Sequence, residues 1–406
     1  MADTPPSSDY DAALAAISDD VLAKLAGPTE TVRGLPNEAF ISDAFLELEK
    51  KHLFPRGWVF AGRAGDISEP GDARPVEVAG HPLILVRGKD KQIRVFQNVC
   101  LHRGARLVTE ALRGTAALNC PYHAWSYKLD GTLASRPHYH GPEMHDRANS
   151  GDNDRDCLFG VRSITWHDWV FVNIDGKAPS FEDYIVSVAG HFEEWDETQF
   201  RFAYHDEFEF QCNWKLAVEN FCDTYHVFKV HPELDRTYTN DDRSMAFPSG
   251  VHLLITNTMV GPSRGLTLDP EGPRLPPIAG LADELMATQV TVNLFPNVTI
   301  VIAAGNLQFI LFEPVAADRC VMRMWYYFVG DAAEAPEHEM ARDLVYNEWT
   351  SLNAEDEDVC RRMQQGRRCE GYDGGRLAPY WDQGTASFHK MIAHAVRGDG
   401  PFAPVN

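Results

Sequence analysis

The sequence predicts the α+β fold class, with an N-terminal all-β domain followed by a C-terminal α+β domain that has a curved antiparallel sheet and long helices. Three observations predict it. The chain has 406 residues, a length that suggests two or three domains. Short strand patterns fill the region from residue 45 to about 175. Beyond that region, strand patterns and long helix patterns are mixed.

An acidic, Ala-rich segment precedes both domains. Tyr10 to Leu25 has helical spacing, and Gly27-Pro28 ends that pattern. We therefore expect a helical arm over residues 1–40, an all-β domain over residues 41–175 and an α+β domain over residues 176–406.

The expected strands of the all-β domain are short and rich in β-branched residues. They are Val76–Val78, Pro82–Arg87, Ile93–Phe96 and a return strand at Trp169–Ile174. Gly88-Lys89-Asp90 predicts a turn, and the polar stretch from Pro142 to Asp156 predicts a loop.

The α+β domain is expected to hold an antiparallel sheet and a long helix over Leu344–Arg368. Its expected strands are Glu207–Phe210, Gln289–Leu294, Val298–Ala303, Leu307–Phe312 and Cys320–Val329. Strands that curve round a long helix leave room for a cavity between them.

Composition excludes several classes of function. The net charge of −22 argues against nucleic acid and anionic membranes as partners. No apolar run reaches the roughly 20 residues of a membrane span, and the N-terminus lacks the pattern of a signal peptide. Six of the eight cysteines are scattered without a disulfide-like pattern, so we expect free thiols and a cytoplasmic protein.

The first metal motif lies in the all-β domain. Cys100-Leu101-His102 is followed after seventeen residues by Cys120-Pro121-Tyr122-His123. Two thiolates can bind one iron and two imidazoles the other, which is typical of a Rieske [2Fe–2S] cluster. The alternative is a structural zinc site. Zinc fingers usually place a Cys pair before a His pair, whereas here each loop supplies one of each.

The second motif surrounds His226 and His231. Asp223 and His226 are three apart, hence neighbours on an expected helix. Pro232 keeps the residue before it out of the α region, so the helix should break there and bring His231 to the same metal. Two histidines and one carboxylate form the facial triad of non-haem Fe(II) oxygenases.

Asp356 is the expected third ligand. The apolar stripe of the long helix runs through Val345, Trp349 and Leu352, then through Val359 or Cys360 to Met363, and Asp356 falls in its gap. A carboxylate on a buried face is costly unless it binds something. The neighbouring Glu355, Glu357 and Asp358 lie off the stripe, in solvent. The alternative is a kinked helix with a solvated acidic run.

Together these motifs resemble those of the α subunit of Rieske non-haem iron ring-hydroxylating oxygenases, from about Phe45 to the C-terminus. The matching positions are Cys100, His102, Cys120, His123, Asn220, Asp223, Tyr225, His226 and His231. Glu355-Asp356, Cys360 and Gln364-Gln365-Gly366 resemble the third-ligand segment of a branch that includes choline monooxygenase-like enzymes. That branch often has a glutamate where this chain has Asp223, so its substrate does not transfer.

The resemblance implies a Rieske cluster that passes electrons to a mononuclear Fe(II). It also implies NAD(P)H as the electron source through a flavin reductase, with or without a ferredoxin. The family assembles as a head-to-tail homotrimer, in some members with a small β subunit. Asp223 would bridge a cluster histidine of one subunit to His226 of another, and Asn220 would gate or orient the iron site. Local backbone capping by Asp223 and a purely structural Asn220 are the alternatives.

Two further groups lie around the cluster loops. Arg103, Arg106, Arg113 and Lys128 form either a docking patch for an acidic electron donor or a solvated surface. Tyr122 and Trp125 are expected to shield the cluster from water.

The resemblance favours hydroxylation of a small aromatic substrate, by mono- or dioxygenation. The alternative is hydroxylation or N-demethylation of a quaternary ammonium compound, which requires aromatic rings round the cation. Phe309, Trp325, Tyr326 and Tyr327 are candidates for such rings or plain core residues. An electron-transfer protein would not need His226, His231 and Asp356, and a ligand sensor without turnover would be distinguished by the absence of oxygen consumption.

Overall fold

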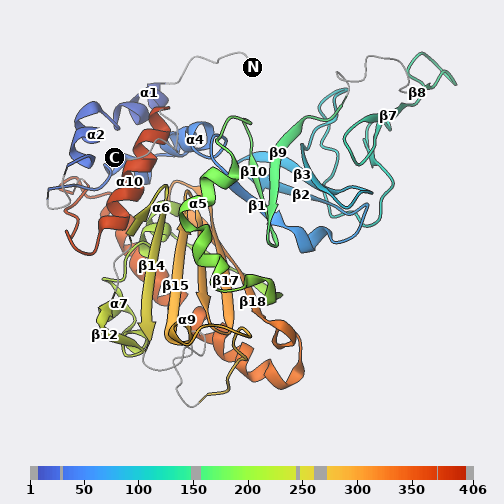
Figure 1. Ribbon diagram of the computed structural model, residues 1–406. Coiled ribbons are helices and arrows are strands. Elements are labelled where there is room, and N and C mark those ends of the chain that lie inside the picture. Colours follow the sequence, from blue (N-terminus) through green and yellow to red (C-terminus); the bar gives the residue numbers. More distant parts are fainter. Residues whose placement is uncertain are drawn as a thin grey trace. The chain divides into compact units, whose positions relative to one another are not determined.

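The computed structural model describes residues 8–27, 31–147, 157–243, 247–259, 272–372 and 374–398. The chain divides into two compact units (Figure 1). The β unit is Phe54–Phe181, and the mixed unit combines Met1–Leu53 with Glu182–Asn406. The β unit is therefore inserted into the chain of the mixed unit. No helix in the described ranges is long and apolar enough to cross a membrane.

Two antiparallel sheets build the β unit. The larger has the order β1-β10-β9-β4-β3-β2, and the smaller has the order β5-β6-β7-β8. The strands are β1 Val59–Arg63, β2 Ala73–Val78, β3 His81–Arg87, β4 Ile93–Gln97, β5 Leu118–Asn119, β6 Ser126–Tyr127, β7 Leu133–Arg136, β8 Asp146–Arg147, β9 Gly160–Trp166 and β10 Trp169–Asn173. All four strands predicted in this unit are confirmed as parts of β2, β3, β4 and β10. Of the predicted loop, residues 148–156 lie outside the described residues.

Both ends of the β unit are tied together. β1 pairs with β10, so the first and last strands of the insertion are neighbours. The amide of Asn173 donates hydrogen bonds to the carbonyls of Pro55 and Gly57, at 3.1 Å each. Because Asn173 is fully buried, these bonds hold the entry and exit of the unit close to each other.

One antiparallel sheet forms the centre of the mixed unit, in the order β11-β18-β17-β16-β15-β14-β12, with β13 beside β14. Its strands are β11 Phe200–Phe210, β12 Tyr238–Arg243, β13 Phe247–Ser249, β14 His252–Met259, β15 Thr288–Leu294, β16 Val298–Ala303, β17 Asn306–Ala316 and β18 Arg319–Val329. The five predicted strands are confirmed, although β11 is longer than expected.

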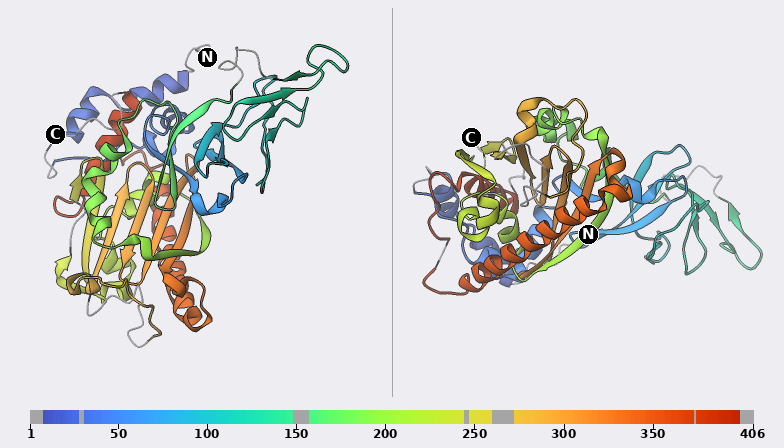
Figure 2. Two further views of the ribbon diagram at one scale, coloured as in Figure 1. Left: turned by 45° about the vertical axis from the view of Figure 1, so that its right-hand side comes forward. Right: turned by 90° about the horizontal axis from the view of Figure 1, so that it is seen from below.

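Helices cover both faces of this sheet. Seen from below, the sheet lies between α9 (Glu339–Gly366) and α5 (Phe181–Glu193) (Figure 2). α9 confirms the predicted long helix, whereas α5 and α10 (Gln383–Arg397) were not predicted. The buried stripe of α9 ends at Gln364 and not at Met363, which is 41 % exposed. The Gln364 amide nitrogen donates to the Phe40 carbonyl at 3.0 Å, and that bond compensates for its burial.

The N-terminal segment belongs to the mixed unit. The expected single helix is two helices, α1 (Ser8–Ala15) and α2 (Asp19–Leu25), because Ser18 caps α2 through a bond from the Val21 N–H. The helices α3 (Glu38–Ile41) and α4 (Asp43–His52) follow. The first unit boundary thus lies after Leu53, where we expected it near residue 40, and the second lies after Phe181, where we expected it near residue 175.

A buried ion pair explains why α4 stays with the mixed unit. The carboxylate of Glu49 accepts hydrogen bonds from Lys215 Nζ at 2.6 Å and from Trp214 Nε1 at 2.9 Å. Both charged side chains are fully buried. Removing either partner would leave an uncompensated buried charge, so α4 is held against α6 (Trp214–Asn220), the helix that precedes His226.

Candidate active site

The two cluster loops of the β unit have the same backbone construction. In the first, Cys100 N–H donates to the Ala105 carbonyl and Gly104 N–H donates to the Cys100 carbonyl. In the second, Cys120 N–H donates to the Trp125 carbonyl and Ala124 N–H donates to the Cys120 carbonyl. The fourth residue after each cysteine has a positive φ, 74° in Gly104 and 55° in Ala124. Each loop therefore presents its Cys and its His from the same kind of tight turn.

The four predicted cluster ligands lie close together, where the two loops reach the surface of the β unit. Cys100 and Cys120 are buried, whereas His102 and His123 are exposed. The two imidazole centroids are 4.7 Å apart. Burial raises the pKa of the Cys100 thiol, and the adjacent Cys120 raises it further. Paired thiols inside and paired imidazoles outside fit an asymmetric two-iron cluster.

Aromatic side chains surround these ligands. The Trp125 ring stacks on His102, with centroids 4.8 Å apart, and is itself 7 % exposed. Tyr127 lies on the buried side, where its hydroxyl is 3.4 Å from Cys100 Sγ and accepts a bond from Leu101 N–H at 3.1 Å. Tyr122 is 57 % exposed. Trp125 thus covers one face of His102. The Tyr122 ring lies against His123, with centroids 3.7 Å apart, but itself stays open to solvent or a partner.

The expected basic patch is partly neutralised. Arg113 pairs with Asp72 at 2.7 Å, and Arg106 pairs with Glu77 at 3.4 Å. Arg103 lies over the ring of Tyr122. Only part of the positive charge at the cluster loops is therefore free for steering an acidic partner.

In the mixed unit, the segment around the iron motif differs from the prediction. α6 ends at Asn220, so Asp223 and His226 lie in a turn and not on a helix. The short helices α7 (Val227–Val230) and α8 (Pro232–Asp235) follow. The predicted break at Pro232 is confirmed, because His231 has φ −121° and ψ 65° and Pro232 begins α8.

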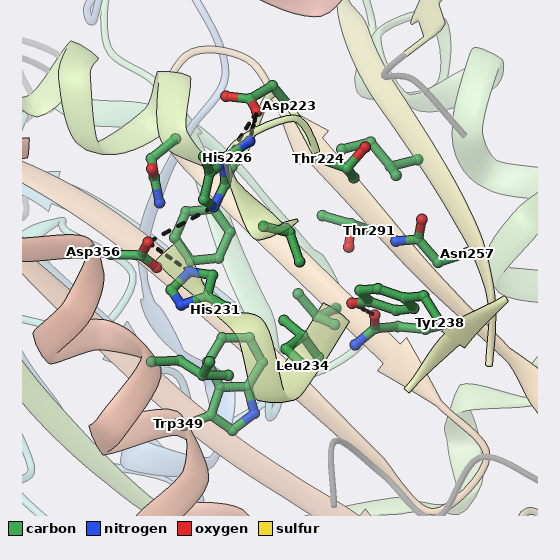
Figure 3. Close-up of a pocket in the computed structure, with 17 residues that line it drawn as sticks. Asp223, Thr224, His226, His231, Leu234, Tyr238, Asn257, Thr291, Trp349 and Asp356 are labelled. Carbon is green, nitrogen blue, oxygen red and sulfur yellow. Dashed lines mark hydrogen bonds and ion pairs between the residues drawn. The ribbon is translucent and has the colours of Figure 1, made fainter. Parts of the chain in front are cut away.

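Those turns bring three predicted ligands together. The ligand atoms of His226, His231 and Asp356 lie within 4.8 Å of one another. Asp356 Oδ1 is 2.8 Å from His231 Nε2 and 3.7 Å from His226 Nε2. Two Nε2 atoms and one carboxylate converging on one point fit a mononuclear iron with open coordination positions (Figure 3).

Each histidine is also held by a second carboxylate. Asp223 Oδ1 is 3.1 Å from His226 Nδ1, and Glu355 Oε2 is 2.6 Å from His231 Nδ1. Such contacts fix the ring orientation of a metal-binding histidine. Although burial lowers the pKa of His231, its bonds with Asp356 and Glu355 leave that pKa raised.

Glu355 is the functional residue that the sequence did not reveal. Its position off the apolar stripe predicted a solvated side chain, and 44 % of the side chain is indeed exposed. The remaining part of the Glu355 side chain is covered, and its carboxylate contacts His231. A Glu directly before a buried Asp, opposite a histidine that precedes a proline, is a weak signal that could have indicated it.

A pocket opens beside the triad, between the sheet and the helices. It is lined by Asn220, Phe221, Asp223, Thr224, His226, Val227, His231, Leu234, Tyr238, Ile255, Asn257, Gln289, Thr291, Val301, Trp349, Leu352 and Asp356. The triad lies on one side, and Thr291, Asn257 and Tyr238 lie on the other (Figure 3). The rings of Phe221 and Trp349 are nearly parallel, with centroids 6.5 Å apart.

The four aromatic residues expected from the sequence as a cation site are not in this pocket. Phe309 and Tyr326 are fully buried core residues of β17 and β18, and Trp325 and Tyr327 lie on β18 beside them. Of the two alternatives for these residues, the plain core role is confirmed, because the pocket lies nearer the β14 and β15 edge of the sheet.

Models of two protein families match the chain. "Ring hydroxylating alpha subunit (catalytic domain)" matches residues 193–398, and "Rieske [2Fe-2S] domain" matches residues 57–145. Their boundaries fall within the mixed unit and the β unit, respectively.

Several known proteins resemble the whole chain or half of it. Glycine betaine monooxygenase oxygenase subunit of Pseudomonas aeruginosa is 23 % identical over 87 % of both chains. Carnitine monooxygenase oxygenase subunit of Escherichia coli is 32 % identical over 49 % of this chain and 52 % of its own.

Solved structures share the fold. A quaternary ammonium Rieske monooxygenase has a TM-score of 0.75 at 22 % identity and covers 92 % of this chain and 98 % of its own. Naphthalene 1,2-dioxygenase from Rhodococcus has a TM-score of 0.70 at 17 % identity, covering 96 % and 98 %.

Proposed function

Because this chain belongs to the family of Rieske ring-hydroxylating oxygenase α subunits, we propose that it is the oxygenase component of a monooxygenase acting on a quaternary ammonium compound. As a member, it is an oxidoreductase that incorporates O₂. The sequence alone favoured an aromatic substrate. The two relatives described above are named for betaine and carnitine, which supports the alternative instead.

The observation that carries the proposal is the lining of the pocket. Phe221 and Trp349 place two aromatic rings beside the triad. A methylated ammonium cation has no N–H to donate, so it is stabilised by ring faces and nearby negative charge. Asp223 lines the same pocket and provides that charge.

The residues divide the chemistry between them. His226, His231 and Asp356 would hold the mononuclear iron, and Cys100, His102, Cys120 and His123 would hold the Rieske cluster. When bound, these groups supply O₂ activation and single electrons. The pocket holds the cation with a carbon attached to nitrogen beside the triad. Hydroxylation of that carbon consumes one O₂, two electrons and two protons and releases water. The C–N bond then breaks to give an amine, an aldehyde and a proton.

A partner must supply the electrons. We propose that NAD(P)H is the source and that a flavin reductase, with or without a ferredoxin, delivers them to the exposed His102 and His123 edge of the β unit.

Electron transfer onward is proposed to occur between subunits of a homotrimer. Asp223 Oδ1 is engaged with His226, but its side chain is 18 % exposed and Oδ2 has no hydrogen bond within the described residues. That oxygen can accept a bond from a cluster histidine of another copy. Exposed apolar side chains lie near Asp223: Tyr225 and Phe228 follow it in sequence, and Met363 and Tyr372 line a second pocket together with Asp223. Such a patch is typical of a protein interface.

The test is turnover of the reduced protein. The purified chain, loaded with iron, is incubated with NADH, a generic reductase and O₂, and with either trimethylammonium compounds or aromatic acids and arenes. Mass spectrometry and a formaldehyde assay follow the products. Loss of a methyl group with formaldehyde in equal amount supports the proposal. Oxygen incorporation into an arene, with no ammonium compound consumed, would contradict the proposal and favour an aromatic substrate.

A further inference from the structure

We propose that the pocket selects an ammonium compound whose other end is a neutral hydrogen-bonding group, such as a hydroxyl or an amide, and disfavours one that ends in a carboxylate. This inference rests on the proposed function and specifies its substrate. Asn257 and Trp349 are the specificity-determining residues. Both line the pocket that opens beside the triad.

Asn257 has an unused polar atom. Its Oδ1 is buried and has no hydrogen-bond partner among the described residues, and the side chain is only 5 % exposed. Because buried polar groups are almost always paired, such an atom in a ligand pocket indicates a partner that arrives with the ligand. The amide projects from β14 on the side of the pocket opposite the triad (Figure 3).

One polar neighbour of Asn257 is already engaged. Gln289 faces it across the β14–β15 ladder, and Gln289 Oε1 accepts a bond from the Tyr238 hydroxyl at 2.9 Å. That bond fixes Gln289 and leaves the Asn257 amide available to the ligand. An amide group both donates and accepts, so it pairs with a hydroxyl, a carbonyl or another amide.

Trp349 supplies a second unused group. Its Nε1–H is buried without a partner within the described ranges, and the side chain is 5 % exposed. Trp349 is seven residues before Asp356 on α9, two turns away on the same helix face. The indole can therefore offer a ring face to the cation and a donor to an oxygen of the ligand.

Charge disfavours a carboxylate in this pocket. Apart from the two histidines of the triad, no described residue that lines it is basic. Asp223 adds negative charge to the lining, whereas the charge of Asp356 would be balanced by the iron that it holds. A carboxylate buried without a cationic partner pays a large desolvation penalty, whereas a hydroxyl needs only one or two hydrogen bonds.

Three probes of similar size test the inference in the loaded enzyme: trimethylammonium compounds that carry a 2-hydroxyethyl, a propyl or a carboxymethyl group. Formaldehyde release gives kcat/KM for each. The hydroxyl probe should exceed the propyl probe by about tenfold, as for one satisfied hydrogen bond, and the carboxylate probe should be the poorest.

Variants locate the preference. Asn257→Leu should lower kcat/KM for the hydroxyl probe to that of the propyl probe, and Trp349→Phe, which removes the N–H and keeps a ring, should reduce the ratio in part. Thr256→Val is the matched control, since Thr256 is exposed on the opposite face of β14, and it should leave the ratio unchanged. Iron content and thermal midpoint confirm that each variant is folded.

The possible failures are distinguishable. If the carboxylate probe is preferred, or if Asn257→Leu keeps the wild-type ratio in a folded protein, the inference is overturned while the proposed function stands. If none of the three probes releases formaldehyde and an arene is oxygenated, both are overturned.

Discussion

The two metal sites of this chain are built in opposite ways. The cluster site uses two local loops of one construction and leaves His102 and His123 exposed. The iron site collects residues more than a hundred positions apart, and its His231 and Asp356 are buried.

That difference follows from what each site must do. Electron entry requires contact with a protein partner, so the imidazole edges stay at the surface. Oxygen chemistry requires a pocket from which bulk water is excluded, so the triad is enclosed and each histidine needs a carboxylate to fix its ring. Asp223 has features of both sites, because it orients His226 and is still partly exposed.

Removing Asp356 should have the largest effect. In Asp356→Ala the proposed iron site loses its carboxylate ligand, so iron affinity should fall by more than about 100-fold, beyond the range seen when outer residues are changed. Turnover should be abolished while the visible spectrum of the cluster persists. Elemental analysis and absorption spectra measure both. Retention of mononuclear iron at wild-type affinity would mean that another residue is the ligand.

Asp223→Asn should slow turnover by about 10- to 100-fold with iron retained. An amide can still hold His226 through its oxygen, but its other atom donates and cannot accept a bond from a second imidazole. Stopped-flow reoxidation of the reduced cluster in the presence of substrate measures the step. A wild-type reoxidation rate would argue that Asp223 only orients His226.

Glu355→Gln should weaken iron binding by about tenfold, because a neutral amide makes His231 a poorer ligand. The control is Asp358→Asn on the same helix, whose carboxylate accepts from Arg362 Nε at 2.7 Å. Competition with a chelator gives the iron affinity of each variant. Equal affinities in the two variants would show that Glu355 is a surface residue only.

Tyr127→Phe should have the smallest effect. It removes the hydroxyl next to Cys100 Sγ, and a hydrogen bond to sulfur favours the reduced cluster. A bond of about 1 kcal/mol corresponds to about 40 mV for one electron, so the reduction potential should fall by about that amount. A redox titration followed by absorption tests this value, and an unchanged potential would mean that the hydroxyl does not donate to the sulfur.

The contrast between the local cluster loops and the long-range iron site also explains which residues could be predicted from the sequence. The cluster ligands could be proposed from the sequence because Cys100 and His102, like Cys120 and His123, are close in the chain and belong to one turn. Asp356 was predictable because a carboxylate interrupts an apolar stripe. The helix expected to carry Asp223 and His226 is not observed. A spacing of three residues indicated neighbours on a helix, but α6 already ends at Asn220.

Contacts over long sequence separations were not predictable. Glu355 contacts His231 across 124 positions, and Glu49 contacts Lys215 across 166. Only a weak local signal distinguishes Glu355 from a solvated acid, and no local pattern places α4 against α6. The two alternatives for Phe309 and Tyr326, a cation site or plain core, could not be separated for the same reason, since a strand has the same alternation whatever its distance from the pocket.

The insertion of the β unit between α4 and α5 also has a consequence for biosynthesis. All of its strands, and the β1–β10 pairing that closes it, are complete once residue 181 has left the ribosome. At that stage α4 cannot form its buried ion pair, because Lys215, the partner of Glu49, is not yet synthesised. The β unit can therefore fold on the nascent chain before the mixed unit is complete.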